Sequence, residues 1–134
     1  MIVKKGAVIA VADGEKLVLF KNSGEANEPR LTALATPEVD MENMSSGTRR
    51  ISKAANPDDK TQNEDAFAAG AAEFLNKQVL RNKIDELIVI AAPKTLGELR
   101  RHFHKETQAR IKGELAKDLT GHSTGQIEKA LAAA

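Results

Sequence analysis

The chain has 134 residues, of which 20 are Lys or Arg and 19 are Asp or Glu, so its formal net charge is +1. This length fits one domain with a single core. The near balance of charges excludes an overall field that would draw the protein to nucleic acid or membrane, so such binding requires a local patch. The absence of Cys excludes disulfides, thiolate nucleophiles and Cys-ligated zinc.

The N-terminal third predicts three strands. Two apolar runs, residues 7–12 and 17–21, flank Asp13-Gly14, a dipeptide that favours a hairpin turn. A second turn over residues 23–29 precedes a third strand, residues 30–36, which ends at Pro37. We therefore expect a three-stranded meander.

The middle of the chain predicts a loop, a helix and a buried strand. Residues 38–63 lack a sustained period and are rich in Ser, Asn, Asp and charge, which predicts a long mobile loop. A helix is expected from about Asn63 to Asn82, where apolar residues recur at helical spacing. The apolar, β-branched run at residues 86–92 predicts a strand covered on both faces.

The C-terminal part predicts a basic helix, a strand and a last helix. Thr95 and Glu98 have the spacing of a capping box, which places the start of the basic helix at Thr95. Residues 111–119 alternate as a fifth strand, and Ser123 and Gln126 form a second capping box. The buried stripe of the basic helix is expected to be Leu96, Leu99, Phe103 and Thr107.

The expected order is therefore β-β-β-α-β-α-β-α in one α/β domain over residues 1–134. Two β-α-β crossovers imply parallel pairing beside the antiparallel meander, so we expect a mixed sheet between helical layers. This order is shared with ribonuclease H-like folds, which suggests a metal-dependent nuclease or hydrolase as one function. Such a site needs converging carboxylates, but Asp13 falls in a turn and the fourth strand ends without an acid. We predict no metal and no cofactor.

The histidines do not predict a metal site either. His102 and His104 lie two residues apart, which on one helix turns them about 200° away from each other. Glu98, His102 and Glu106 share a helical face and predict a ladder of ion pairs. His122 lies in a Gly-bounded turn, where it either contacts a ligand at the end of the sheet or is structural.

Anion binding is the remaining chemistry. The start of the basic helix at Lys94 and Thr95 would present N–H groups and positive charge. Two groups of cations are expected to form a patch for phosphates, and the alternative is a solvated basic face. The groups are Arg100, Arg101 and Lys105 on the helix and Arg49, Arg50 and Lys53 in the loop.

Three segments carry a resemblance to a known family. "NPDDKTQNEDAFAAGAAEFLNK", "IVIAAPKTLGELRRHFHKE" and "KGELAKDLTGHSTGQIEKAL" resemble bacterial host attachment proteins, which are required for attachment to host cells. That family is similar to the middle domain of archaeal and eukaryotic peptide-chain release factors and of Pelota. In release factors, a Gly-Gly-Gln loop before the first helix promotes peptide release. Here Gln62 follows Lys60 and Thr61, so the resemblance implies a related scaffold without that chemistry.

We therefore expect a small, cytoplasmic, non-catalytic binding protein with an indirect role in attachment to host cells. Its expected partner is RNA or the ribosome, reached through the basic loop and helix. A protein partner, bound by an interaction module, is an alternative, as is the metal-dependent hydrolase. We expect no membrane association, because the apolar run at residues 7–12 is too short to span a bilayer, and no recognition of DNA sequence.

Overall fold

The computed structural model describes residues 1–35, 37, 39 and 58–134, and for residues 58–61 it describes the backbone alone. The elements are β1 (Val8–Ala12), β2 (Leu17–Asn22), β3 (Leu31–Ala33), α1 (Asp58–Leu80), β4 (Leu87–Ala91), α2 (Pro93–His102), α3 (Lys105–Arg110), β5 (Ile111–Leu115) and α4 (Thr124–Ala133). Within these ranges, no helix is long and apolar enough to cross a bilayer. The predicted order is confirmed, with α3 as an additional helix.

The five strands form one mixed sheet in the order β3-β2-β1-β4-β5. The β1–β2 and β2–β3 pairs are antiparallel, and the β1–β4 and β4–β5 pairs are parallel, as the predicted crossovers require. The Asp13 N–H closes the first hairpin by donating to the Lys16 carbonyl at 3.0 Å. The mixed sheet and the turn at Asp13-Gly14 are therefore confirmed.

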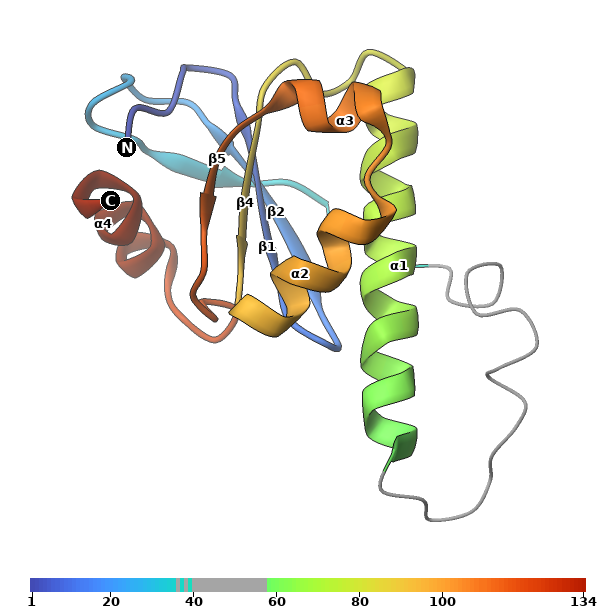
Figure 1. Cartoon of the computed structure of the whole chain (residues 1–134). Helices are drawn as coiled ribbons and strands as arrows, with labels where there is room; N and C mark the ends of the chain where they lie inside the picture. Colours follow the sequence, from blue (N-terminus) through green and yellow to red (C-terminus); the bar gives the residue numbers. More distant parts are fainter. Residues whose placement is uncertain (36, 38, 40–57) are drawn as a thin grey trace.

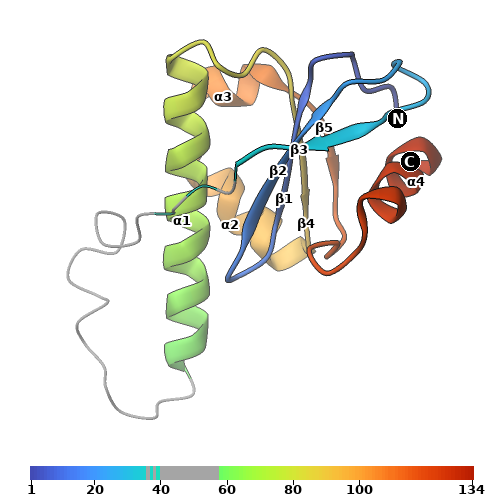
Figure 2. The same cartoon turned by 180° about the vertical axis from the view of Figure 1, so that it is seen from behind.

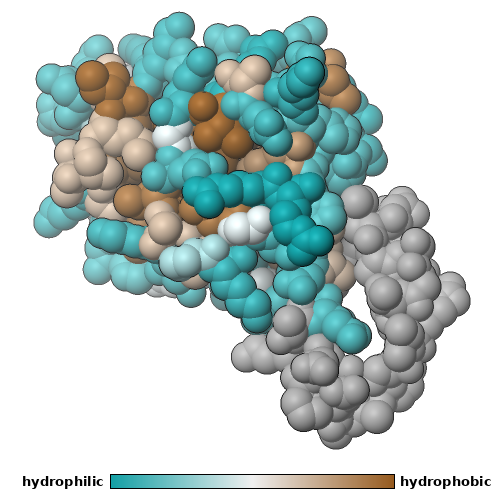
Figure 3. Space-filling view, in the orientation of Figure 1, coloured by the Kyte–Doolittle hydropathy of each residue, from teal (hydrophilic) through white to brown (hydrophobic). Residues whose placement is uncertain are grey.

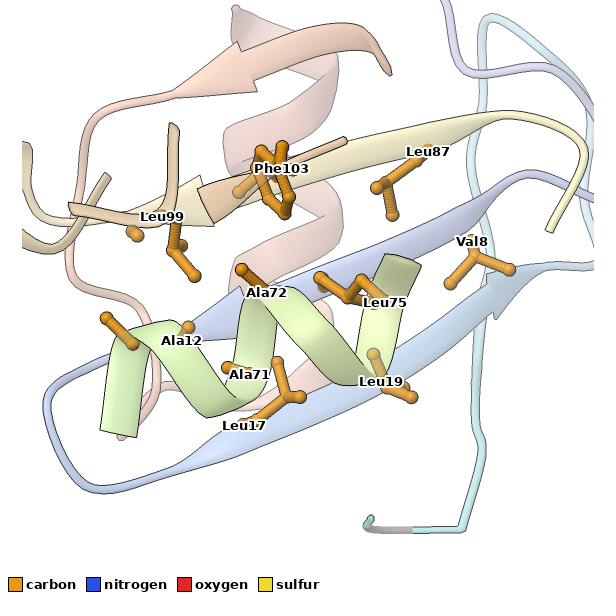
Figure 4. Packing of buried hydrophobic residues seen from close by; sticks show 14 of the residues in the cluster. Val8, Ala12, Leu17, Leu19, Ala71, Ala72, Leu75, Leu87, Leu99 and Phe103 are labelled. Atoms are coloured by element: carbon orange, nitrogen blue, oxygen red, sulfur yellow. The ribbon is translucent and has the colours of Figure 1, made fainter. Parts of the chain in front are cut away.

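Helices cover both faces of the sheet, with α1, α2 and α3 on one face and α4 on the other (Figures 1 and 2). All residues of β1 and β4 are buried, which explains why both strands read as continuous apolar runs. Ala71, Ala72 and Leu75 of α1 point toward the strands, and the two small side chains allow the helix to lie close to the sheet (Figure 4). Ile127 and Leu131 of α4 are buried on the opposite face. The predicted three-layer architecture is confirmed.

Several predicted boundaries are wrong. The third strand stops at Ala33 and the fifth at Leu115, so both are shorter than their apolar patterns. The loop predicted over residues 38–63 extends too far, because α1 begins at Asp58. Acidic residues in a first turn are favoured by the helix dipole, and Asp58 and Asp59 supply this signal. The rest of the predicted loop, apart from residue 39, lies outside the described residues.

The predicted basic helix is two helices, because α2 ends at His102 and α3 begins at Lys105. In a continuous helix the His104 N–H would donate to the carbonyl of residue 100. Instead it donates to the side-chain oxygen of Asn76 at 2.9 Å, while Asn76 Nδ2 donates to the His102 carbonyl at 2.9 Å. A buried amide on α1 therefore replaces the helical hydrogen bonds at this break. The predicted buried stripe is nevertheless confirmed, since all four of its side chains are buried.

The start of α2 also differs from the prediction. The helix begins at Pro93 with Ala92 as its N-cap, and no side chain caps it. The predicted Thr95–Glu98 capping box is therefore wrong. Proline suits the first helical position because its φ angle is already helical and it has no N–H to satisfy. The Ser123–Gln126 capping box of α4 is confirmed in both of its hydrogen bonds.

Candidate nucleic-acid interface

The predicted anion site starts where α2 leaves the carboxyl end of β4. Lys94 lies in the first turn of α2, and its ammonium group is 4.0 Å from a carboxylate oxygen of Glu64 on α1. The turn after β1 packs against the same Glu64 side chain. Gly14 lies so close to it that a Cβ at this position would be 2.5 Å from Glu64 Cγ. The carboxyl ends of β1 and β4 thus meet α1 and α2 here, and the Lys94 side chain is 66% exposed. The Lys94 charge is available to an outside ligand.

Arg100 lies farther along α2 and is held by β5. Its Nε and a terminal nitrogen donate to Glu114 Oε1 at 3.1 and 2.5 Å, a two-point contact between the helix and the edge strand. Hydrogen bonding to Glu114 and the charge of that carboxylate raise the pKa of the Arg100 guanidinium. This arginine is therefore permanently charged, but its nearest counterion is already in place.

Arg101 contacts a carboxylate as well. Its guanidinium donates to Glu98 Oε1 at 3.2 Å, and the other oxygen of Glu98 lies 3.3 Å from His102 Nε2. Burial raises the pKa of Asp65 on α1, and the negative charge of Glu98 raises it further. The helix face predicted to be positive therefore also carries acidic side chains. Hydrophilic side chains cover most of the face that carries α1 and α2 (Figure 3).

Lys105 and the histidines complete this part of the surface. Lys105 is exposed at the start of α3, and among the described residues no carboxylate forms an ion pair with it. His104 lies 3.8 Å from a Glu73 oxygen, so His102 and His104 contact different carboxylates, as their spacing predicts. The predicted ladder from Glu98 through His102 to Glu106 is only half correct, because Glu106 lies on α3 beyond the break.

The remaining predicted residues lie elsewhere. Arg49, Arg50 and Lys53 are outside the described residues, so a shared face of loop and helix cations stays a prediction. His122 is exposed in the turn before α4. Two residues before it, the Thr120 hydroxyl lies 2.8 Å from both Asp13 Oδ2 and Asp118 Oδ1. No sequence pattern indicates the Asp13–Thr120 contact, because it joins residues far apart in the chain. In the described part of the chain, no group of three or more acidic or histidine side chains is arranged to hold a metal ion.

Gln62 lies in a helix, whereas the Gly-Gly-Gln motif of release factors lies in a loop. The residues that match the Gly-Gly-Gln loop form the first turns of α1, and Gln62 is an exposed residue inside that helix. Residues within a helix have their φ and ψ angles fixed at helical values and lack the freedom that two glycines provide. The local structure therefore differs from a mobile catalytic loop.

One comparison with known proteins gives a match. The sequence model of a protein family described as "Bacterial archaeo-eukaryotic release factor family 12" matches residues 6–131. The match covers all the described strands and helices except the last residues of α4. A search of curated proteins finds no match.

Proposed function

The chain belongs to bacterial archaeo-eukaryotic release factor family 12, and we propose that it is a small non-catalytic protein that binds RNA on the ribosome. Family membership supports the ribosome as the partner. The observation that carries the non-catalytic part is the position of Gln62 inside α1, in place of a glycine-rich loop. Binding without peptide release is the function that this combination favours.

The proposed contact surface consists of Thr95 and the cations on α2 and α3, together with the cations of the sequence that precedes α1. Its members are Lys94, Thr95, Arg100, Arg101, Lys105, Arg49, Arg50 and Lys53. The side chains of Lys94 and Arg101 are 66% and 74% exposed, so a phosphate can approach either cation from solvent. Phosphate contacts of this kind give affinity that falls with salt and carries no sequence information.

Ribosome co-sedimentation tests this surface. Arg101→Glu with Lys105→Glu should abolish pelleting with ribosomes at low salt, because both side chains are exposed and neither is part of the core. Lys117→Glu with Lys129→Glu is the matched control, since it changes the net charge equally at other exposed positions. The control variant should still pellet. Absence of pelleting by the unmodified protein, or equal loss in both variants, would refute the proposal.

A metal-dependent hydrolase is the second candidate function. It is favoured by one observation, the packing of Glu64 against Gly14 beside Asp13, which brings two acids toward the carboxyl end of β1. This activity predicts RNA cleavage that requires Mg²⁺ or Mn²⁺ and is lost in Asp13→Asn. If the protein cleaves no RNA at any concentration of either ion, this candidate is eliminated.

We also propose a cytoplasmic location and an indirect role in attachment to host cells. The support is the resemblance of the segments from Ala55 onward to host attachment proteins, combined with membership of a release-factor family. A pull-down from bacterial lysate, with and without nuclease treatment, separates the two kinds of partner. A partner lost after nuclease treatment supports RNA binding, and one that remains supports a protein-interaction module.

A further inference from the structure

A second basic region lies where β1 and β4 begin, at the end of the sheet opposite to Lys94. It is a cavity of about 300 Å³ beside the first residue of β1 and the turn after α1. The charged side chains that line it are Lys4, Lys5, Lys21, Lys83, Asp85 and Glu86. Four lysines around one cavity stand out in a chain whose net charge is only +1. The cavity shares no residue with the α2 surface described above.

A turn just before β1 carries Lys4 and Lys5. The Ala7 N–H donates to the Lys4 carbonyl at 3.0 Å, which closes a turn with Lys5 and Gly6 at its centre. Gly6 has a φ angle of +90°, as the third position of a type II turn requires, and its own N–H donates to the Asn22 carbonyl at 2.7 Å. The backbone that bears Lys4 and Lys5 is therefore fixed before any ligand arrives.

The other side of the cavity is formed by the end of α1 and by β2. Asn82 has a φ angle of +59° and ends the helix, and the Lys83 N–H donates back to the Gln78 carbonyl at 2.9 Å. Lys21 is exposed on β2 between two buried residues, so its side chain points away from the core. Gly6 and Asn82 are the two residues with positive φ angles in the described part of the chain, and both line this cavity.

The cavity has more positive than negative side chains, with four lysines and two acids. Glu86 pairs with Lys4 at 3.4 Å, and Asp85 pairs with Arg110 outside the cavity at 3.0 Å. Both acids therefore have a partner. Within the described ranges, no ion pair involves the remaining three lysines of the cavity.

We propose that this cavity binds a phosphate group. A phosphate carries close to two negative charges and several strong acceptor oxygens, which matches several ammonium groups arranged around one space. The volume is at the lower end of the range for small-ligand sites, so it accommodates one or two phosphates rather than a large apolar molecule. The phosphate comes either from a small free ligand or from an RNA backbone. The proposal does not depend on ribosome binding, because the cavity and the α2 surface have no residue in common.

Calorimetric titration with two probes, inorganic pyrophosphate and a short single-stranded RNA, tests this site. Lys5→Glu with Lys83→Glu should weaken binding of the responding probe by about tenfold or more, the equivalent of losing one charge-assisted hydrogen bond. Lys117→Glu with Lys129→Glu, an equal change of charge elsewhere, should leave the affinity within about twofold. Thermal melts of both variants report whether the fold is kept.

Each outcome of the titration has a defined meaning. Binding of pyrophosphate that depends on the cavity lysines identifies a small phosphate ligand, and dependence seen with RNA alone identifies the RNA backbone as the source. No saturable binding of either probe would overturn the proposal, as would equal weakening in both variants. Arg101→Glu with Lys105→Glu should leave pyrophosphate affinity unchanged, so failure here is distinguishable from failure of the α2 surface in ribosome binding.

Discussion

The Thr107 hydroxyl donates to the side-chain oxygen of Asn76 at 2.6 Å, and both residues are fully buried. The same oxygen accepts the His104 N–H, and the Asn76 amide group donates to the His102 carbonyl. One side chain on α1 therefore satisfies backbone groups on both sides of the break between α2 and α3. This contact determines where the basic segment bends.

Removing the Asn76 amide should destabilise the protein strongly. Asn76→Ala leaves the His102 carbonyl and the His104 N–H at the α2–α3 break without their side-chain partner, and an unsatisfied polar group shielded from water costs roughly 1–3 kcal/mol. We expect a loss of about 3 kcal/mol in the free energy of unfolding, measured by chemical denaturation. Thr107→Val removes only one hydroxyl donor and should cost about 1 kcal/mol. Equal effects of the two substitutions would contradict the role assigned to Asn76.

The two capping boxes predicted from sequence provide a matched pair of substitutions. Ser123→Ala removes a hydrogen bond that the Gln126 N–H makes at 3.2 Å, so it should cost about 1 kcal/mol. Thr95→Ala should be nearly neutral, because α2 begins at Pro93 and the Thr95 side chain makes no capping bond. Chemical denaturation of both variants measures this difference. A larger loss of stability in Thr95→Ala than in Ser123→Ala would show that α2 does not begin at Pro93.

Asp13 should make the stability depend on pH. Burial raises the pKa of Asp13, but hydrogen bonds from two backbone N–H groups and from the Thr120 hydroxyl outweigh burial, so the net pKa lies below its usual value. A carboxyl with a depressed pKa stabilises the fold above its unfolded pKa of about 4, and this contribution disappears as the pH falls through the folded pKa.

Asp13→Asn isolates this contribution, because the amide oxygen still accepts hydrogen bonds but carries no charge. The difference in unfolding free energy between wild type and variant should be largest near neutral pH and should shrink below about pH 4. A difference that stays constant from pH 7 to pH 3 would show that the Asp13 charge has no role in stability.

A substitution at Gly14 tests how closely the β1–β2 hairpin packs against α1. Gly14→Ala places a methyl group where Glu64 now sits, and overpacking of this kind costs about 1–3 kcal/mol. Truncating the neighbour in the double variant Gly14→Ala with Glu64→Ala should restore much of the lost stability. If the double variant is no more stable than Gly14→Ala alone, the two elements do not pack as described.

Most of the fold could be predicted from local patterns. The β1–β2 hairpin, the fully buried strands β1 and β4 and the capping box of α4 each depend on residues close in sequence, and all are confirmed. The errors arise where distant residues decide. The break at Phe103 and His104 depends on Asn76 of α1, some 26 to 28 residues earlier, and no periodicity within the helix reveals it.

The candidate site could be predicted less well, for the same reason. Arg100 and Arg101 do lie on exposed helix, but their counterions differ. Glu98, the counterion of Arg101, lies three residues earlier on the same helix and could be predicted from spacing. Glu114, the counterion of Arg100, approaches it only because β5 pairs parallel to β4. The lysine cavity likewise combines residues from the first turn, β2 and the end of α1, which only the folded sheet brings together.

The central claim is that this member of a release-factor family binds the ribosome without releasing peptide. The most direct test is sucrose-gradient sedimentation of bacterial ribosomes that carry labelled peptidyl-tRNA, with the protein in excess. We predict that the protein migrates with the ribosomes while the label stays on the tRNA. Release of labelled peptide, or a protein that remains at the top of the gradient at low salt, would contradict the claim.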